Sequence, residues 1–438
     1  MRSSPGGGVP LVLGLERGPE SFSVHRTAVF AAGGGRDDAN LAFAERLVKF
    51  LLWQKGAGRI TVEGPAPLVE GLRKIFAPGG ARAFDAAFMG RVYERVFAIE
   101  GMAADTTPPA RESASPKGGH LDGNRIGLDL GASDRKVAAV IRGEPVFTEE
   151  VVWSPRDQQD PGWHLAQIQS ALKIAGARMP RVDAIGVSTA GVVINNRILV
   201  ASLFRGVPEA RFQADVKGIF QAVQKEWNGI PLEVANDGDV TALAGSMSLK
   251  DGAVLGIAMG SSQAAGYVTP ARCLTDWLSE LAFAPVDWRR NAPADEWSGD
   301  LGVGVQYFSQ VAAGRLATAA GLPLTAGASP AERLKEIQAA HESGDERAAR
   351  VFDSIGCFLG YALAYYAEFY EIRHVLALGR VTSGRGGPLI VDRALAVLRD
   401  EFPEVAARIR IHMPEGEIER RHGQAVAAAS LPVIAGTS

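Results

Sequence analysis

The chain reads Asn236-Asp237-Gly238-Asp239-Val240-Thr241-Ala242-Leu243-Ala244-Gly245 directly after a short apolar run, Pro231 to Ala235, that predicts a strand. Catalytic groups are commonly carried on loops and element ends that a rigid scaffold positions. A Gly-rich turn in the region Ile126 to Val140 precedes this acid, and a second Gly/Ser turn in Leu255 to Val268 follows it. Two turns of the kind that hold phosphate, placed on either side of one carboxylate, predict phosphoryl transfer with Asp237 as general base.

Length and composition indicate a globular protein of more than one domain. The chain has 438 residues, and single hydrophobic cores stop growing at roughly 250 to 300 residues. It is 47% hydrophobic and 22% charged, and it has no uninterrupted apolar run of the roughly 18 residues that a membrane helix needs. We therefore expect no membrane contact and, because the apolar run Val9 to Leu15 is a weak secretory signal, a cytoplasmic location.

Net charge and cysteine content argue against nucleic-acid binding, a disulfide framework and an all-cysteine zinc site. The net charge is −3, and residues 1–101 hold 13 Lys and Arg against 10 Asp and Glu, so nucleic acid is an unlikely main partner. The two cysteines, Cys273 and Cys357, cannot build a disulfide framework or an all-cysteine zinc site. We expect small-molecule chemistry.

The order of elements predicts an α/β protein with an extra N-terminal module. Residues 103–123 contain almost no large apolar side chains and are predicted to be a linker. Before them, residues 1–102 predict a small α/β module with helices over 38–54 and 68–76 and strands over 59–63 and 95–100. After them we expect one lobe over 124–238, a second over 239–421, and a closing helix over 422–438 that returns to the first lobe.

Three turns at strand ends are candidates for nucleotide binding. The first is Asp129-Leu130-Gly131-Ala132-Ser133, where Gly131 and Ala132 allow close backbone approach, Ser133 offers a hydroxyl, and Asp129 could hold Mg²⁺ through water. The second contains Gly260, Ser261 and Ser262, and the third contains Gly379, Ser383 and Gly384. A hairpin turn or a surface loop would look similar to each one alone, and an Asp at position 237 could simply cap the helix that follows.

These residues together resemble the ROK sugar kinases and regulators (repressor, open reading frame, kinase), which have the two-lobed, ribonuclease H-like fold of actin, hexokinase and the heat-shock chaperone ATPases. The first turn resembles the phosphate motif D-I-G-G-T, and Asn236-Asp237 resembles part of E-N-D-A-N. Met259 to Gly266 is similar to the second phosphate motif, L-G-T-G-I-G-G-G, and Leu376 to Gly387 to the adenosine motif. Gly186 to Val193 resembles G-I-x-x-P-G-x-V without its proline.

The resemblance implies an ATP- and Mg²⁺-dependent kinase of a sugar or sugar-like polyol. It implies that Asp237 is the base and that Asn236, Gly191 and Glu280 bind the acceptor. The expected partners are the acceptor, the nucleotide and a second copy of the chain in a homodimer.

The chain departs from the family at its zinc site. Glu280-Leu281-Ala282-Phe283 resembles the E-x-G-H signature with Phe283 in place of the zinc-binding His. Gly299 to Val305 resembles the zinc loop without its cysteines, and Val305 stands where the family has a second sugar-binding Glu. We expect no zinc here, and the identity of the acceptor is left open.

Two other functions stay open at this stage. The family also contains repressors with a DNA-binding unit before the kinase-like fold, so a sugar-sensing regulator without catalysis is the main alternative. The N-terminal module shows no clear helix-turn-helix and no basic patch. The third possibility is an assembly role in which that module docks a partner.

Overall fold

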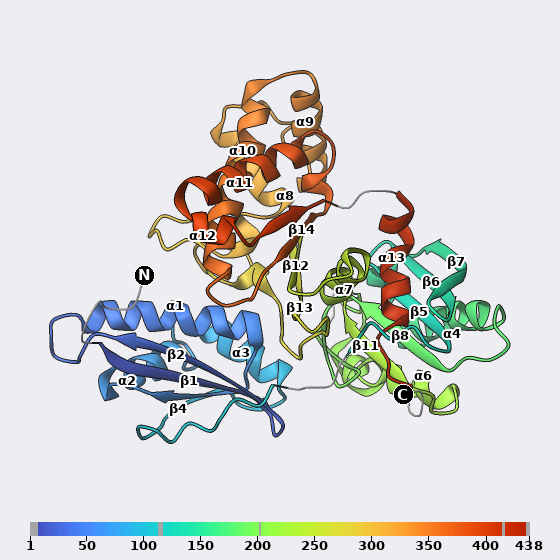
Figure 1. The fold of residues 1–438 in the computed structure, drawn as a ribbon, viewed down its shortest axis with the longest axis horizontal. Coiled ribbons are helices and arrows are strands. Elements are labelled where there is room, and N and C mark those ends of the chain that lie inside the picture. The colour runs from blue at the N-terminus through green and yellow to red at the C-terminus, as the bar shows by residue number, and fades with distance from the viewer. Residues whose placement is uncertain (1–7, 113–116, 201–202, 414–416, 435–438) are drawn as a thin grey trace. The chain divides into compact units, whose positions relative to one another are not determined.

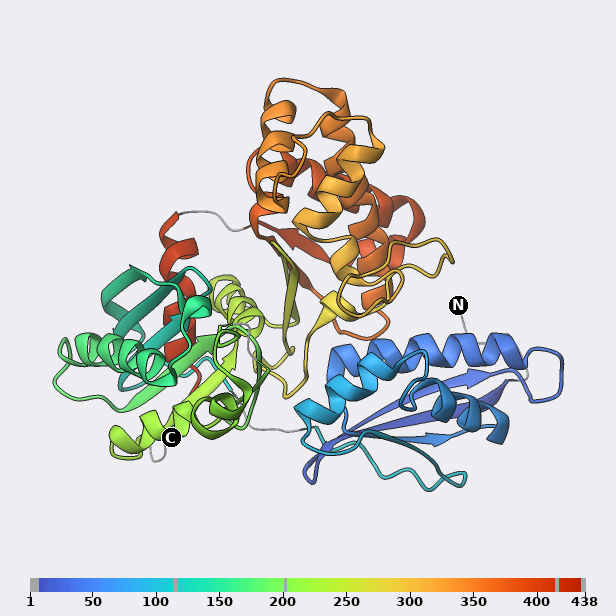
Figure 2. The same cartoon turned by 180° about the vertical axis from the view of Figure 1, so that it is seen from behind.

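The computed structural model describes residues 8–112, 117–200, 203–413 and 417–434 (Figures 1 and 2). Its contacts divide the chain into two compact units. The first joins Met1–Ala114 to Asp276–Gln306, and the second joins Ser115–Thr275 to Tyr307–Ser438. No helix in the described part of the chain is both long and apolar enough to cross a membrane.

The first unit contains a four-stranded sheet of order β2-β1-β3-β4. Its strands are β1 (Val9–Gly18), β2 (Ser21–Val29), β3 (Arg59–Glu63) and β4 (Ala98–Gly101), and its helices are α1 (Asp37–Lys55), α2 (Ala66–Ile75) and α3 (Ala83–Val92). The predicted helices and strands correspond to α1, β3, α2 and β4, whereas the sequence did not predict the β1–β2 hairpin or α3. The central strand β1 is buried at five successive residues from Leu11 to Leu15, so it lacks the alternation that marks a half-buried strand.

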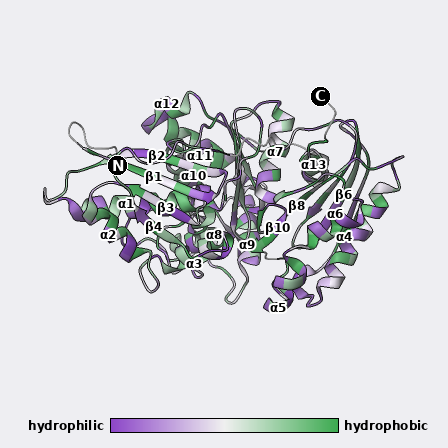
Figure 3. Cartoon of the chain, turned by 90° about the horizontal axis from the view of Figure 1, so that it is seen from below, coloured by the Kyte–Doolittle hydropathy of each residue, from purple (hydrophilic) through white to green (hydrophobic). Residues whose placement is uncertain are grey.

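Hydrophilic and hydrophobic residues both occur along α2 (Figure 3), as expected of a helix with one buried face. Leu68, Val69 and Leu72 are buried, while Glu70 and Lys74 are exposed. The helix therefore covers one part of the sheet and leaves its polar residues to solvent.

The remainder of the first unit, residues 276–306, has little regular structure. It contains two short 3₁₀ turns, η3 (Leu281–Phe283) and η4 (Gly304–Gln306). The sequence did not predict that this segment would join the N-terminal module, because long-range contacts leave no periodic signal.

The second unit contains two sheets. The first sheet has the order β11-β8-β5-β6-β7, in which β11, β8 and β5 are parallel and β6 and β7 are antiparallel. Its strands are β5 (Asn124–Leu130), β6 (Asp134–Ile141), β7 (Glu144–Val152), β8 (Ala184–Thr189) and β11 (Leu232–Asn236). The accompanying elements are α4 (Pro161–Gly176), α5 (Glu209–Arg211), α6 (Ile219–Glu226) and the hairpin β9 (Val192–Ile194) and β10 (Arg197–Val200).

The second sheet has the order β13-β12-β14-β15. Its strands are β12 (Val254–Met259), β13 (Gln263–Val268), β14 (His374–Leu378) and β15 (Arg410–His412). The helices of this part are α7 (Asp237–Leu249), α8 (Gln310–Ala319), α9 (Pro330–Glu342), α10 (Glu346–Tyr366), α11 (Gly386–Glu401) and α12 (Pro403–Ala406). The α/β class predicted from the sequence is confirmed.

The last helix, α13 (Glu417–Ala429), returns to the first sheet of this unit. Two glycines allow its close approach, because a Cβ atom on Gly127 of β5 would lie 1.8 Å from the carbonyl oxygen of Ala425, and one on Gly186 of β8 would lie 1.7 Å from that of Ala428. The helix was predicted over 422–438; it ends at Ala429, and residues 435–438 lie outside the described part of the chain.

We expect Gly127→Val to separate α13 from the sheet, because the new side chain would overlap the backbone of Ala425. Overpacking of this kind destabilises by about 3 kcal/mol. Thermal unfolding measures the loss. The matched control is Gly423→Ala in α13 itself, where nothing lies within 4 Å of the added atom and where the replacement should stabilise the helix by about 0.5 to 1 kcal/mol. An unchanged melting temperature for Gly127→Val would contradict the contact.

Candidate active site

The parallel strands β5, β8 and β11 end at one edge of their sheet and bring the candidate residues together. In the strand register Asp129 lies opposite Ser188, and Asn236 lies opposite Thr189. The hydroxyl of Ser188 donates a hydrogen bond of 2.7 Å to Oδ1 of Asp129. Ligands of open α/β sheets commonly bind outside the carboxyl ends of the strands, so this edge is the candidate site.

Asp129 is a buried carboxylate, with 3% of its surface exposed. Burial, together with the nearby charges of Asp237 and Asp134, raises its pKa to about 6, although the hydrogen bond from Ser188 and the charge of Lys136 act in the opposite direction. Clustered carboxylates with displaced pKa values are typical of functional sites.

Asp237 is the first residue of α7, and the structure corrects one interpretation of it. The helix cap is Asn236, whose Oδ1 accepts a hydrogen bond of 2.7 Å from the amide of Gly238. The carboxylate of Asp237 accepts from the same amide at 3.0 Å. Burial raises the pKa of Asp237, and the amide of Gly238 partly offsets that rise. The side chain keeps partial exposure to solvent.

Asn236 and Gly191, both predicted to bind substrate, are in direct contact. The amide nitrogen of the Asn236 side chain donates a hydrogen bond of 2.8 Å to the carbonyl oxygen of Gly191. Gly191 has φ of 110°, a backbone conformation that favours glycine. The cap of α7 therefore also fixes the loop after β8.

Arg135 and Lys136, the two cations that follow the first turn, are largely withdrawn from solvent. Arg135 is 5% exposed, and the ammonium of Lys136 lies 2.8 Å from Oδ1 of Asp134 and 3.8 Å from Oδ2 of Asp129. Lys136 is the direct cross-strand neighbour of Asp129 in the β5–β6 register. A hairpin assignment for the turn between them could have predicted this pair from the sequence.

The first candidate nucleotide turn joins β5 to β6. Its amide of Gly131 donates to the carbonyl of Asp134 at 2.9 Å, and Ala132 and Ser133 are exposed at the tip. The hydroxyl of Ser133 donates to the carboxylate of Asp134 at 2.9 Å. The turn thus presents small residues and one hydroxyl beside Asp129.

The second and third turns lie next to each other, because β12 and β14 are parallel neighbours. In the second, the amide of Gly260 donates to the carbonyl of Ser262 at 2.9 Å, and Ser261 and Ser262 are exposed. In the third, a Cβ atom on Gly379 would lie 2.6 Å from the carbonyl oxygen of Met259, at the end of β12. Further along this turn, the hydroxyl of Ser383 donates to the carbonyl of Arg380 at 2.6 Å, and Gly384 has φ of 67°.

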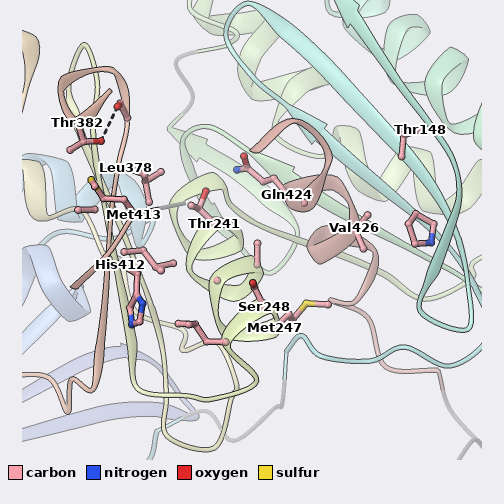
Figure 4. Close-up of a pocket in the computed structure, with 18 of the residues that line it drawn as sticks. Thr148, Thr241, Met247, Ser248, Leu378, Thr382, His412, Met413, Gln424 and Val426 are labelled. Atoms are coloured by element: carbon pink, nitrogen blue, oxygen red, sulfur yellow. Dashed lines mark hydrogen bonds between the residues drawn. The ribbon is translucent and has the colours of Figure 1, made fainter. Parts of the chain in front are cut away.

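A pocket of about 1160 Å³ in the second unit is lined by two of the predicted nucleotide-binding residues, Gly379 and Ser383 (Figure 4). Its other polar side chains are Thr148, Thr241, Ser248, Thr382, His412 and Gln424. The sequence did not predict Gln424, whose side-chain amide donates to the carbonyl of Asp237 at 3.0 Å and to the hydroxyl of Ser188 at 3.3 Å. Through Gln424 the pocket borders the carboxylate site.

Glu280, the third predicted substrate-binding residue, belongs to the first unit, whereas Asn236 and Asp237 belong to the second. Its backbone amide donates to the carbonyl of Trp53 at 2.9 Å. Across the described residues, no group of three or more His, Cys, Asp or Glu side chains is arranged to hold a metal ion.

No protein-family model and no curated protein sequence matches the chain. Solved structures do. A ROK hexokinase from Thermus thermophilus is 18% identical with a TM-score of 0.52, covering 70% of this chain and 96% of its own. The Lmo2764 protein from Listeria monocytogenes, a putative N-acetylmannosamine kinase, is 17% identical with a TM-score of 0.52, covering 70% and 97%. A ROK family transcriptional regulator, a homolog of the E. coli MLC protein, is 17% identical with a TM-score of 0.54, covering 89% and 95%.

This chain has the ROK fold. The fold predicted from the resemblance is thereby confirmed, and with it the two-lobed α/β architecture. Both kinases and a transcriptional regulator share the ROK fold, so the fold alone does not separate a kinase from a regulator.

The raised pKa of Asp129 predicts how stability changes with pH. The native protein holds a proton on this group up to about pH 6, whereas the unfolded chain releases it near the ordinary aspartate pKa of 3.8. The free energy of unfolding therefore falls by up to about 3 kcal/mol as the pH rises from about 4 to about 6, because the native protein must then bury the ionised carboxylate of Asp129. Asp129→Asn removes the titration, so its melting temperature should exceed the wild-type value increasingly over that range.

Thermal unfolding between pH 4 and 7.5, without nucleotide or Mg²⁺, measures this difference. The matched control is Asp353→Asn on α10, an exposed carboxylate 3.5 Å from Arg393, whose curve should run parallel to that of the wild type. If the melting temperatures of Asp129→Asn and the wild type differed by the same amount at every pH, Asp129 would not be a buried carboxyl group with a raised pKa.

Proposed function

We propose that this protein transfers the terminal phosphoryl group of ATP to a hydroxyl of a sugar or a sugar-like polyol. The observation that carries the proposal is that two acidic residues, Asp129 at the end of β5 and Asp237 directly after β11, lie at the carboxyl edge of one sheet, where the charge of Asp237 helps to raise the pKa of Asp129. Phosphoryl transfer needs one group to accept the proton of the attacking hydroxyl and another to hold the metal that neutralises the phosphates. Two carboxylates in different surroundings can divide these tasks.

Asp237 is the proposed general base. Its side chain is surrounded by protein yet keeps partial solvent exposure, so an acceptor hydroxyl can reach it. A pKa raised by burial brings the carboxylate nearer to neutral pH, where a base is most effective. The backbone carbonyl of Asp237 is held by Gln424, and Thr241 donates to the same carbonyl at 2.7 Å. These contacts fix the start of α7 and with it the carboxylate.

Asp129 is the proposed holder of Mg²⁺ through water. Carboxylate and hydroxyl oxygens are the ligands that this ion prefers, and Mg²⁺ usually keeps several waters. Asp129, with Ser188 beside it, supplies such oxygens, and Lys136 adds a positive charge in the same place. The ion would neutralise phosphate oxygens during transfer, and the exposed residues 132–133 and 261–262 would offer backbone amides to them.

The pocket beside Gly379 is the proposed place of the nucleotide. Gly379 and Ser383 line it, and Thr382, whose hydroxyl donates to the carbonyl of Gly379 at 3.0 Å, lines it as well. Gln424 lies between this pocket and the carboxylate pair.

The acceptor is proposed to contact Asn236 and Gly191, as the resemblance implies. Asn236 already caps α7 and holds Gly191, so its first role is to fix the geometry of the loop. Two of the similar structures are a hexokinase and a putative N-acetylmannosamine kinase, which supports a sugar as acceptor.

A sugar-sensing regulator is the second candidate. The observation that favours it is coverage, because the regulator structure aligns with 89% of this chain and the two kinases with 70%. A regulator would bind a DNA operator in a salt-dependent manner and release it with sugar. Fluorescence anisotropy with genomic fragments, with and without a sugar panel, tests this. Sugar-reversible operator binding without phosphoryl transfer would replace the first proposal.

Asp237→Asn should lower turnover by about 10²- to 10⁴-fold on the best acceptor, because it removes the base while keeping the shape of the side chain. ADP release with a panel of sugars and Mg·ATP measures it. Asp353→Asn should keep wild-type turnover. Asp353, on α10, pairs with Arg393 of α11 and is not one of the proposed site residues. Wild-type turnover in Asp237→Asn would exclude Asp237 as the base.

A further inference from the structure

Residues 276–306 contain almost no regular secondary structure, yet several of their side chains are buried. Leu281, Ala284 and Val303 are fully buried in this segment. A long irregular segment loses much conformational entropy when it is ordered, so specific contacts must hold it. These contacts come from α1 and from the region of α3 in the N-terminal module.

A buried charge network provides the first contact. The ammonium of Lys49, on α1, lies 2.7 Å from Oδ1 of Asp85, on α3, and 2.5 Å from Oδ2 of Asp300, in the segment. The side chains of Lys49 and Asp85 are fully buried, and that of Asp300 is 7% exposed. Arg82 makes a second ion pair with Asp300. One carboxylate of the segment is therefore held by two cations of the module, and burial makes each partner costly to lose.

Backbone hydrogen bonds are the second link between the segment and the N-terminal module. The amides of Ser279 and Glu280 each donate at 2.9 Å to the carbonyls of Gln54 and Trp53, respectively. These carbonyls belong to the last turn of α1, where a helix has no partners of its own. Arg46 of the same helix donates to the carbonyl of Asp287 at 2.5 Å. The segment thus caps the C-terminal end of α1.

An aromatic contact is the third link between the segment and the N-terminal module. The ring of Phe283 lies 4.6 Å from the ring of Trp53 and 5.8 Å from that of Phe84. The indole nitrogen of Trp53 donates to Asp85 at 2.6 Å. Trp53 thereby joins the aromatic contact to the charge network. Phe283 is also the residue at which the sequence departs from the zinc-binding pattern of the family, so an apolar contact with the module stands at that position.

We propose that the N-terminal module is a built-in scaffold for residues 276–306, in which Lys49 and Trp53 hold the segment in place. The ordering of the segment, Glu280 included, depends on these contacts and does not rest on the proposed function.

Hydrogen exchange of the full-length protein, followed by mass spectrometry, tests the scaffold without any ligand. In Trp53→Ala we expect peptides covering 276–306 to exchange at least about tenfold faster, because the large cavity and the lost hydrogen bond raise the opening equilibrium. Peptides covering β12 and β14 should exchange as in the wild type. Trp53→Phe keeps a ring against Phe283 and should retain most of the protection.

Two further variants separate the segment from the general stability of the module. Phe283→Ala changes only the segment and should raise its exchange while the β1 and β3 peptides stay protected. Leu41→Ala is the matched control on α1, since Leu41 packs against Gly71 of α2, and it should leave 276–306 protected. Wild-type exchange of 276–306 in both Trp53→Ala and Phe283→Ala would overturn the scaffold.

Discussion

The second unit is built around the burial of two neighbouring carboxyl groups. Asp129 and Asp237 repel each other, and burial raises the pKa of both. The surrounding structure offsets this cost locally: Ser188 donates to Asp129, Lys136 stands across the strand, and the amide of Gly238 at the start of α7 faces Asp237. A site of this kind is unfavourable for stability in the empty protein, which is typical of sites whose charges await a cation or a proton.

The elements that hold this pair come from distant parts of the chain. Strands β5, β8 and β11 supply the edge, and α13 returns from the C-terminal part to place Gln424 against both Ser188 and Asp237. Gly127 and Gly186 make that return possible, since any larger residue would meet the backbone of α13. Packing of the last helix and geometry of the site are therefore coupled.

The first unit also buries charged side chains, but there they hold an irregular segment in place. Its irregular segment is ordered by a buried lysine between two carboxylates and by aromatic rings, and not by its own secondary structure. In this network each carboxylate is in direct contact with a cation: Lys49 contacts Asp85 and Asp300, and Arg82 contacts Asp300 and Glu45. Direct ion pairs between buried side chains are suited to a structural role, because removing either partner is costly.

Local features of this protein could be predicted from the sequence. Strand 59–63 and the apolar run before Asn236 have clear patterns, and the turns carry Gly, Ser and Asp in motif order, which was enough to predict the fold class and to single out Asp129 and Asp237. The meeting of residues far apart in the chain became visible only in the folded structure. Lys136 facing Asp129, Gln424 reaching Asp237, and residues 276–306 joining α1 all depend on strand register and helix packing. Such contacts are set by the shape of the whole core, and periodicity within a short window of sequence contains no information on them.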